Sequence, residues 1–234
     1  MAVVIHRFGE IRSTQDEARR LVDTGEAEPG HVIVADRQTD GRGRFGRVWL
    51  SPQGGLYATY IIARQPSLAW IAGLASARAF GRFGVDATLK WPNDLLVNDA
   101  KLAGILIEKI GKLALIGIGI NLVDAPLETA TSVRIVGGTV QRGELLVAIW
   151  EEICAAEHSD DLQTAYRERL GTLGQSVRVI PEKEGPEING TAVDIDAEGR
   201  LLVETNRGVH AISTGECVHL RTQTNDKRSD HGTD

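Results

Sequence analysis

The sequence predicts an α+β protein, with a mixed, largely antiparallel sheet covered by helices and then a small β-barrel. Residues 88–123 consist of apolar, β-rich runs separated by short turns at 98–100 and Gly111, the pattern of antiparallel hairpins. Segments with helical signals flank these runs, and so hydrophobic a sheet needs helices over one face. Beyond residue 175 the pattern changes to five short β-rich runs at roughly ten-residue spacing, which favours a small barrel.

Local signals predict each element before residue 171. Thr14, Gln15, Asp16 and Glu17 form a capping box, in which the Thr14 hydroxyl accepts the Glu17 amide. Gly25 then ends the helix, and the apolar runs that follow are short enough to be strands. In chain order we expect a helix over 15–24, strands over 31–35 and 56–63, a helix over 66–83, the hairpins of 88–123, and helices over 142–157 and 160–170.

The last part of the chain predicts a second domain. Strands are expected over 176–180, 190–195, 201–205, 209–213 and 217–221, with turn clusters between them. We expect the boundary within 171–175, which gives a larger domain over 1–172 and a small barrel over 173–221. Residues 222–234 contain no large apolar side chain, so a disordered tail is expected there.

Composition excludes several classes of protein. Lys and Arg number 26 and Asp and Glu 32, so the formal net charge is −6, unlike that of a dedicated DNA-binding protein. The 42% of hydrophobic residues can bury a sizeable core. No signal peptide or transmembrane run is evident, Cys154 and Cys217 form no disulfide framework, and the histidines lack metal-ligand spacing. We therefore expect a cytoplasmic protein without a structural metal, binding neither nucleic acid nor membrane.

Residues 39–47, called here the arginine segment, concentrate positive charge in an otherwise acidic chain. From Arg37 to Arg47 the chain has four arginines and one aspartate, which gives a local charge of +3. The glycines allow close backbone approach to a ligand, and guanidinium groups match phosphate geometry. A phosphate-bearing ligand, RNA and an inert surface loop fit this composition equally well. The segment is not a Walker loop, because no Gly-Lys-Ser/Thr follows it.

Three further motifs carry candidate site residues. Residues 90–94 (KWPND) place a lysine, an amide and a carboxylate near one turn. Residues 101–106 (KLAGIL) begin with a lysine that is either a cation at a pocket mouth or, more commonly, a solvent-facing hairpin residue. Residues 117–121 (GIGIN) have glycines at alternate strand positions, which bare one sheet face for a flat ligand or for a tightly packed helix.

Together these motifs resemble those of one family. GRGRFGRVW, KWPND, KLAGIL and GIGIN, in this order, closely resemble the biotin protein ligases (the biotin–acetyl-CoA-carboxylase ligases), and the resemblance covers nearly the whole chain. Ser13, Thr14 and Gln38 match polar positions of the family, whereas Gln15 stands where many relatives have Asn. The resemblance implies a class II synthetase-like catalytic domain over 1–172 and an SH3-like domain over 173–221. It also implies a ligase only, because the chain begins directly at the catalytic domain.

The resemblance implies an activity and a set of site residues. Biotin and ATP form biotinyl-5′-AMP, with Mg²⁺ accompanying ATP, and biotin passes to a lysine of a biotin carboxyl carrier protein. The implied catalytic residues are Lys101 and Arg42, and our hypothesis for the group that orients or deprotonates the acceptor amine is Asp94. The implied biotin-binding residues are Ser13, Thr14, Gln15, Gln38, Arg42, Gly43, Arg44, Lys101, Gly104, Gly117 and Gly119. The implied ATP-binding or adenylate-binding residues are Arg42, Arg44, Trp49, Lys90, Asn93, Lys101 and Asn121.

Other functions remain open at this point. A lipoate or octanoate ligase shares the catalytic fold, and an RNA-binding module would use the arginine segment and the small barrel to grip a backbone. The acidic net charge of −6 and the isolation of the +3 stretch from Arg37 to Arg47 favour the ligase. Trp49 fits simple core packing as well as adenine binding. The resemblance makes a homodimer a further expectation.

Overall fold

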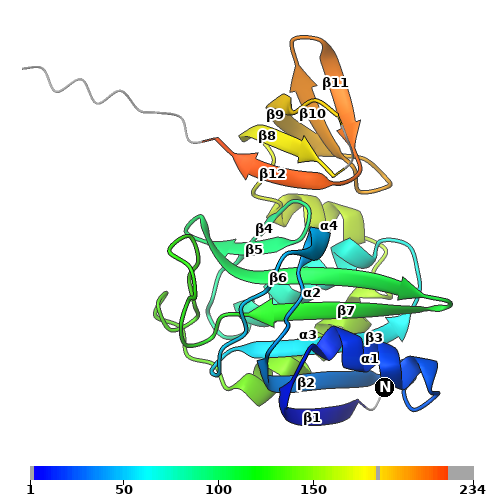
Figure 1. Ribbon diagram of the computed structural model, residues 1–234. Coiled ribbons are helices and arrows are strands. Elements are labelled where there is room, and N and C mark those ends of the chain that lie inside the picture. The colour runs from blue at the N-terminus through cyan, green and yellow to red at the C-terminus, as the bar shows by residue number, and fades with distance from the viewer. Residues whose placement is uncertain (1–2, 183–184, 221–234) are drawn as a thin grey trace, which may run out of the picture.

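The computed structural model describes residues 3–182 and 185–220, in which the larger domain is built on a seven-stranded sheet of order β1-β2-β3-β7-β6-β5-β4 (Figure 1). Its strands are β1 (Val4–Ile11), β2 (His31–Gln38), β3 (Leu56–Ala63), β4 (Thr88–Lys90), β5 (Asp94–Val97), β6 (Ala100–Ile110) and β7 (Leu113–Ile120). Strands β1 and β2 run parallel and every other pair of neighbours antiparallel, which confirms the predicted mixed, largely antiparallel sheet.

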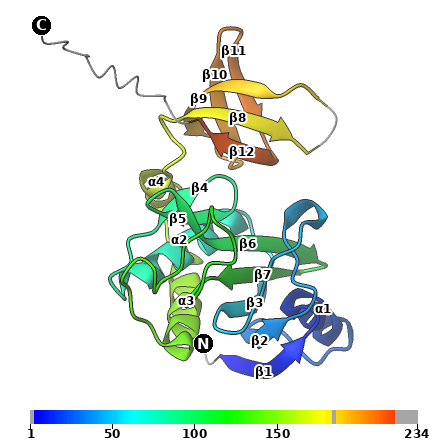
Figure 2. The ribbon, with the colours of Figure 1, turned by 60° about the vertical axis from the view of Figure 1, so that its left-hand side comes forward.

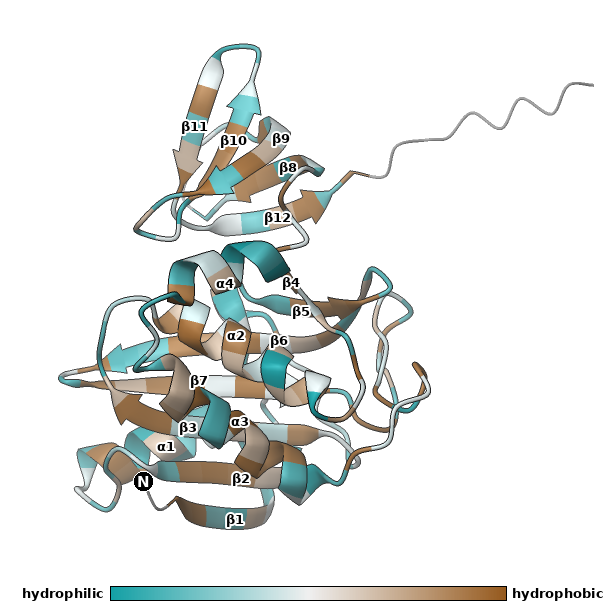
Figure 3. Ribbon diagram, turned by 180° about the vertical axis from the view of Figure 1, so that it is seen from behind, coloured by the Kyte–Doolittle hydropathy of each residue, from teal (hydrophilic) through white to brown (hydrophobic). Residues whose placement is uncertain are grey.

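Helices cover both faces of this sheet. The helices are α1 (Thr14–Asp23), α2 (Leu68–Gly81), α3 (Arg142–Ala156) and α4 (Leu162–Arg169). Helices α2 and α3 lie across one face, and α1 lies on the opposite face beside β2 and β3 (Figures 1 and 3). Side-chain alternation along the strands explains the two layers: Val32 belongs to the core under α2 and α3, whereas its neighbour Ile33 belongs to the core under α1.

A second sheet of five antiparallel strands follows, in the order β11-β10-β9-β8-β12 (Figure 2). Its strands are β8 (Ser176–Pro181), β9 (Ile188–Ile195), β10 (Leu201–Thr205), β11 (Gly208–Ile212) and β12 (Gly215–His219). All five lie within two residues of the predicted bounds. Buried side chains of this sheet, such as Val179 and Leu201, join the same core cluster as α2, α4 and β4. Trp91 reinforces the junction, because its indole nitrogen donates to the carbonyl of Gly199 at 3.1 Å.

The N-terminal elements correct two expectations. The cap of α1 is Ser13, whose hydroxyl accepts from the amides of Gln15 and Asp16, so the capping box predicted at Thr14 is wrong. Glu17 does not reach back to a cap, because it pairs with Arg20 one turn along at 2.8 Å. Strand β1 was not predicted, since this edge strand is half-exposed and its sequence, VIHRFGEI, mixes polar and apolar residues.

The remaining helices match their predicted ranges within two residues at each end. The tail expected over 222–234 lies outside the described residues. Among the described helices, none is long and apolar enough to cross a membrane.

Candidate functional site

One cavity of about 300 Å³ gathers the motifs that lie far apart in the sequence. It opens between the bare face of β6 and β7, the arginine segment and the turn that leads into β12. Every site residue predicted from the sequence lines it: Ser13, Thr14, Gln15, Gln38, Arg42, Gly43, Arg44, Trp49, Lys90, Asn93, Asp94, Lys101, Gly104, Gly117, Gly119 and Asn121. A volume of this order is typical of a small-molecule site.

Glycines form the floor of the cavity on β6 and β7. Gly104 and Gly119 lie opposite each other in the antiparallel register. The indole of Trp49 lies flat against both, and a Cβ at Gly104 would come within 2.9 Å of its ring. A Cβ at Gly117 would come within 2.6 Å of the side-chain oxygen of Gln15. The absence of side chains at these glycines leaves space for a ring against the sheet, and in this structure the Trp49 ring fills that space at Gly104 and Gly119.

A polar network closes one end of the cavity. The side-chain oxygen of Gln38 accepts from the backbone amide of Thr14 at 2.8 Å and lies 3.1 Å from its hydroxyl. The buried hydroxyl of Thr59 reaches both Thr14 and Gln15, at 3.0 and 3.1 Å. The amide nitrogen of Gln38 donates to Ser51 at 2.8 Å. This end therefore offers several fixed donors and acceptors at the N-terminus of α1, which suits an uncharged polar group.

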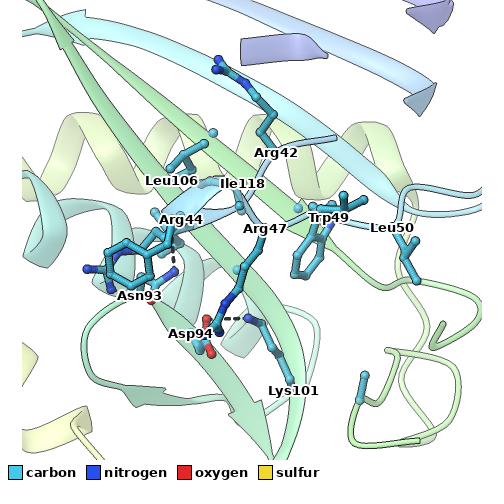
Figure 4. Close-up of a pocket in the computed structure, with 18 of the residues that line it drawn as sticks. Arg42, Arg44, Arg47, Trp49, Leu50, Asn93, Asp94, Lys101, Leu106 and Ile118 are labelled. Atoms are coloured by element: carbon cyan, nitrogen blue, oxygen red, sulfur yellow. Dashed lines mark hydrogen bonds and ion pairs between the residues drawn. The ribbon is translucent and has the colours of Figure 1, made fainter. Parts of the chain in front are cut away.

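An ion pair stands at the centre of the site. Lys101 Nζ lies 2.7 Å from Asp94 Oδ1, and the two side chains are 35% and 19% exposed (Figure 4). The ammonium group also lies 5.3 Å from the centroid of the Trp49 ring, within cation–π range. Although the ions are close, their alignment does not satisfy Asp94 Oδ1 with a hydrogen bond among the described residues. The predicted hairpin lysine is therefore a half-buried cation, with a buried acceptor beside it.

The arginines of the segment point in different directions (Figure 4). Arg42 pairs with Asp16 at 2.6 Å and with Glu108 at 3.4 Å, away from Lys101. Arg44 donates instead to neutral groups, among them the Asn93 side-chain oxygen at 3.2 Å. Burial lowers the pKa of Arg44, although the nearby carboxylates oppose that shift. A half-buried guanidinium held by neutral acceptors is a ready partner for an anion.

Two other predicted residues are tied to the backbone. The Asn93 amide donates to the Ile105 carbonyl at 3.0 Å, which fixes the KWPND turn against β6. The buried Asn121 amide donates to the Thr131 carbonyl at 3.0 Å. Both hold the walls of the cavity in shape. Lys90, the last residue of β4, is close enough to β12 for its charge to act on Glu216 and Cys217.

Comparisons with known proteins identify the family and the fold. Residues 8–122 match the biotin/lipoate A/B protein ligase family, and residues 172–220 match the biotin protein ligase C terminal domain. The biotin–[acetyl-CoA-carboxylase] ligase of Mycobacterium tuberculosis is 32% identical over 89% of this chain and 86% of its own length. The chain belongs to the biotin protein ligase family.

Other members of the family agree with this assignment. The bifunctional ligase/repressor BirA of Escherichia coli is 32% identical over 85% of this chain and 68% of its own length. The biotin protein ligase from Aquifex aeolicus, solved in complex with biotin and ATP, is 30% identical with a TM-score of 0.80. That likeness covers 94% of this chain and 99% of the Aquifex chain. The predicted biotin protein ligase family and fold class are therefore confirmed.

Sequence reasoning missed part of this ligase site. Arg47 was counted only as charge, and the structure pairs it with Glu216 from the second sheet. The 214–216 turn was not a candidate, because a short strand end carries no motif and its role comes from contact across the two sheets. Thr59 was also missed, since an isolated threonine in an apolar strand gives no signal. Burial does not single Thr59 out either, because β3 is buried along almost its whole length.

Two buried polar atoms test whether the cavity suits a polar ligand. Within the described residues, the indole nitrogen of Trp49 has no hydrogen-bond partner, and Asp94 Oδ1 has the ion pair with Lys101 at 2.7 Å but no well-aligned hydrogen bond. One is a donor and the other an acceptor, and both belong to residues that line the cavity. Buried unpaired polar groups are costly, so a ligand with complementary groups gains by satisfying them. The residues present therefore fit a ligand that has both apolar and hydrogen-bonding parts.

Proposed function

We propose that this enzyme forms biotinyl-5′-AMP from biotin and ATP and then transfers biotin to a lysine of a biotin carboxyl carrier protein. One observation carries the proposal: a half-buried lysine, a guanidinium without a carboxylate partner among the described residues, and a glycine floor line the same cavity. The bicyclic ring of biotin would pack against the glycine floor. The ammonium of Lys101 and the guanidinium of Arg44 would offset the charges of the biotin carboxylate and the ATP phosphates.

The first step joins two anions. An oxygen of the biotin carboxylate attacks the α-phosphorus of ATP, the bond to the β-phosphate oxygen breaks, and pyrophosphate leaves. Lys101 is assigned the role of neutralising the carboxylate and the α-phosphate, which requires its ammonium to turn from Asp94 to the ligand. Arg44 and Arg42 are assigned to the phosphates and to covering the product. Covering matters because a mixed anhydride hydrolyses readily in water.

Mg²⁺ is proposed to arrive on the triphosphate. The described residues hold no group of three or more His, Cys, Asp or Glu side chains placed to bind a metal ion. The triphosphate itself supplies oxygen ligands of the kind that Mg²⁺ prefers. The cation would offset charge on the phosphate oxygens while the carboxylate approaches.

The second step uses the amine of the acceptor lysine. Its nitrogen attacks the acyl carbon of the anhydride, AMP leaves with the electrons of the broken C–O bond, and the amine gives up a proton. Asp94 is assigned to orient or deprotonate that amine. The assignment is supported by its buried oxygen, which becomes available once Lys101 has moved to the anionic ligand.

The remaining polar residues are assigned to the two ligands. Ser13, Thr14, Gln15 and Gln38 are proposed to serve the ureido group of biotin, because they supply donors and acceptors at one end of the cavity. Gly43 lets the backbone of the segment approach the same ligand. Trp49, Lys90, Asn93 and Asn121 are proposed to line the nucleotide part.

Several wider assignments accompany this function. We propose a catalytic domain over 1–172 and an SH3-like domain over 173–221, as the change from one sheet to the other supports. The free thiols of Cys154 and Cys217 support a cytoplasmic location. The net charge of −6 supports a ligase that does not act as a repressor, which a DNA gel-shift assay at low salt would test. The expected homodimer stays a prediction for sedimentation analysis.

ATP–pyrophosphate exchange tests the proposed function. We expect exchange of labelled pyrophosphate into ATP only when biotin is present, and incorporation of labelled biotin into a carrier domain. Lipoate and octanoate serve as competitors, and exchange that depended on either of them would reassign the substrate. Equal exchange with and without biotin would overturn the proposal. Salt-dependent affinity for a polynucleotide, with no exchange, would favour the RNA-binding alternative.

A further inference from the structure

The tip of the arginine segment is a tight turn that has little support of its own. The amide of Gly43 donates to the Arg47 carbonyl at 2.7 Å, and the amide of Arg47 donates to the Arg44 carbonyl at 3.1 Å. Phe45 and Gly46 adopt positive φ angles of 58° and 70°, which complete the turn. Phe45 is 41% exposed, so the turn is not anchored by burial of its one large apolar side chain.

The second sheet supplies the anchors instead. Arg44 Nη2 donates to Thr214 Oγ1 at 2.7 Å, and Arg44 Nη1 lies 3.5 Å from the Gly215 carbonyl. Arg47 pairs with Glu216, and this contact lowers the pKa of the Glu216 carboxyl. Both arginines of the tip are therefore held by residues 214–216, where the short turn after β11 leads into the first residues of β12 (Figure 1).

The turn is itself held in place. Thr214 Oγ1 donates to Glu182 Oε2 at 2.9 Å, so its lone pairs face Arg44. A Cβ at Gly215 would come within 2.7 Å of the Ile180 carbonyl, so β8 packs directly beneath the turn. The contacts thus connect the paired strands β8 and β12 to the exposed tip of the arginine segment, which covers the cavity.

We propose that residues 214–216 form a latch that holds the tip of the arginine segment over the cavity, and that Thr214 and Glu216 are positioning residues for the ligase reaction. They act through Arg44 and Arg47 and touch no reacting atom. The functional half of this inference rests on the proposed function, whereas the latch itself does not. Opening the latch frees the segment while the Lys101–Asp94 pair stays in place.

Hydrogen exchange on the full chain tests the latch without any ligand. Glu216→Gln and Arg47→Gln are each expected to speed amide exchange in peptides spanning 39–50 by about two- to fivefold, the range for an exposed ion pair. The double variant should exchange no faster than either single one, because the two share one interaction. Thr214→Val should have a similar effect through Arg44. Exchange at the wild-type rate in Glu216→Gln would overturn the latch.

A matched control is a second ion pair between the two parts of the chain. Arg167 of α4 pairs with Asp194 of β9 at 2.7 Å, at comparable exposure, but it touches no part of the arginine segment. Asp194→Asn should therefore leave exchange over 39–50 unchanged. Faster exchange there in Asp194→Asn would mean that general loosening, not the latch, controls the segment, and would overturn the proposal.

Release of the intermediate tests the positioning role. With biotin and ATP but no acceptor, Glu216→Gln should release biotinyl-AMP about two- to fivefold faster than the wild type and Asp194→Asn. The charge swap Arg47→Glu with Glu216→Arg should restore slow release, which a merely structural role would not predict. Unchanged release despite faster exchange would overturn the positioning role. A wild type that makes no adenylate would instead refute the proposed function, and exchange would still decide the latch.

Discussion

The floor of the cavity and the arginine segment above it are built in opposite ways. The floor lies on β6 and β7, which are paired without interruption from Ala103 to Ile110, and carries one lysine in a half-buried ion pair. The segment carries three arginines, and their side chains are held mainly by residues from other parts of the chain. We infer that the reaction needs one cation whose strand stays fixed while its ammonium turns from Asp94 to the ligand, and others on a segment that moves to admit and enclose ligands.

Loss of the fixed cation should have the largest effect. Lys101→Ala is expected to slow adenylate formation by about a hundred- to a thousandfold, the range for removing one preorganised electrostatic contact. Biotin binding should survive in part, because the floor is intact. Lys109→Ala is the matched control, since Lys109 lies on the same strand and is exposed. Single-turnover formation of biotinyl-AMP measures the effect, and a decrease of only a few fold would place the fixed cation elsewhere.

Filling the floor should weaken ligand binding. Gly119→Ala places a methyl group well inside contact distance of the Trp49 indole, and the paired strands leave the ring as the part that moves. We expect overpacking to cost about 1–3 kcal/mol, so biotin affinity should fall about tenfold. Gly9→Ala is the control, because a Cβ at Gly9 meets nothing within 4 Å. Calorimetric titration with biotin measures both, and wild-type affinity in Gly119→Ala would show that the floor does not bear the ligand.

The carboxylate beside the fixed cation should affect the second step. Asp94→Asn, supplied with preformed biotinyl-AMP, is expected to slow transfer to the carrier domain by about tenfold to a hundredfold. Preformed intermediate removes any effect through Lys101 on the first step. Asp99→Asn in the adjoining exposed turn is the isosteric control. Transfer by Asp94→Asn at the wild-type rate would remove Asp94 from the mechanism.

The same contrast explains how far sequence reasoning reached. Strands β6 and β7 and their glycines were predicted because alternation and short turns are local signals. The pairing of Lys101 with Asp94 was not, because it depends on the register between β5 and β6, which has an irregularity at Leu95 and Leu96. Motif order placed both residues in the site, but only the fold shows that they neutralise each other.

The segment shows the opposite limit. Its charge and glycines fitted a phosphate-bearing ligand, RNA or an inert loop equally well, and nothing local predicted that Arg42 would pair with Asp16 and Glu108. Nor did the sequence predict that Arg47 would meet a carboxylate more than 160 residues away. Such contacts come from packing the second sheet beside the first, and a single sequence carries no short-range trace of them. The wrong prediction of a cap at Thr14 has another cause. Ser13 and Thr14 are both good capping residues, and the extended backbone at Ser13 makes Ser13 the cap.

The junction that supports the segment predicts a smaller, pH-dependent effect. Thr172 Oγ1 accepts from the Trp91 amide at 2.9 Å and lies 3.1 Å from His219 Nε2, so its hydroxyl links the KWPND turn to β12. Burial lowers the pKa of His219, and the charge of Lys90 acts in the same direction. The folded state therefore resists protonation of His219, whereas the unfolded chain takes up a proton near the ordinary pKa of about 6.5.

Stability should accordingly fall as the pH drops through that region, because the unfolded state then binds more protons than the folded state. His219→Gln removes this contribution, so its melting temperature should fall less than that of the wild type between pH 7 and pH 5, by about 1–3 °C. His210→Gln on exposed β11 is the control and should keep the wild-type slope. Identical slopes for all three proteins would mean that His219 is not held neutral at the junction.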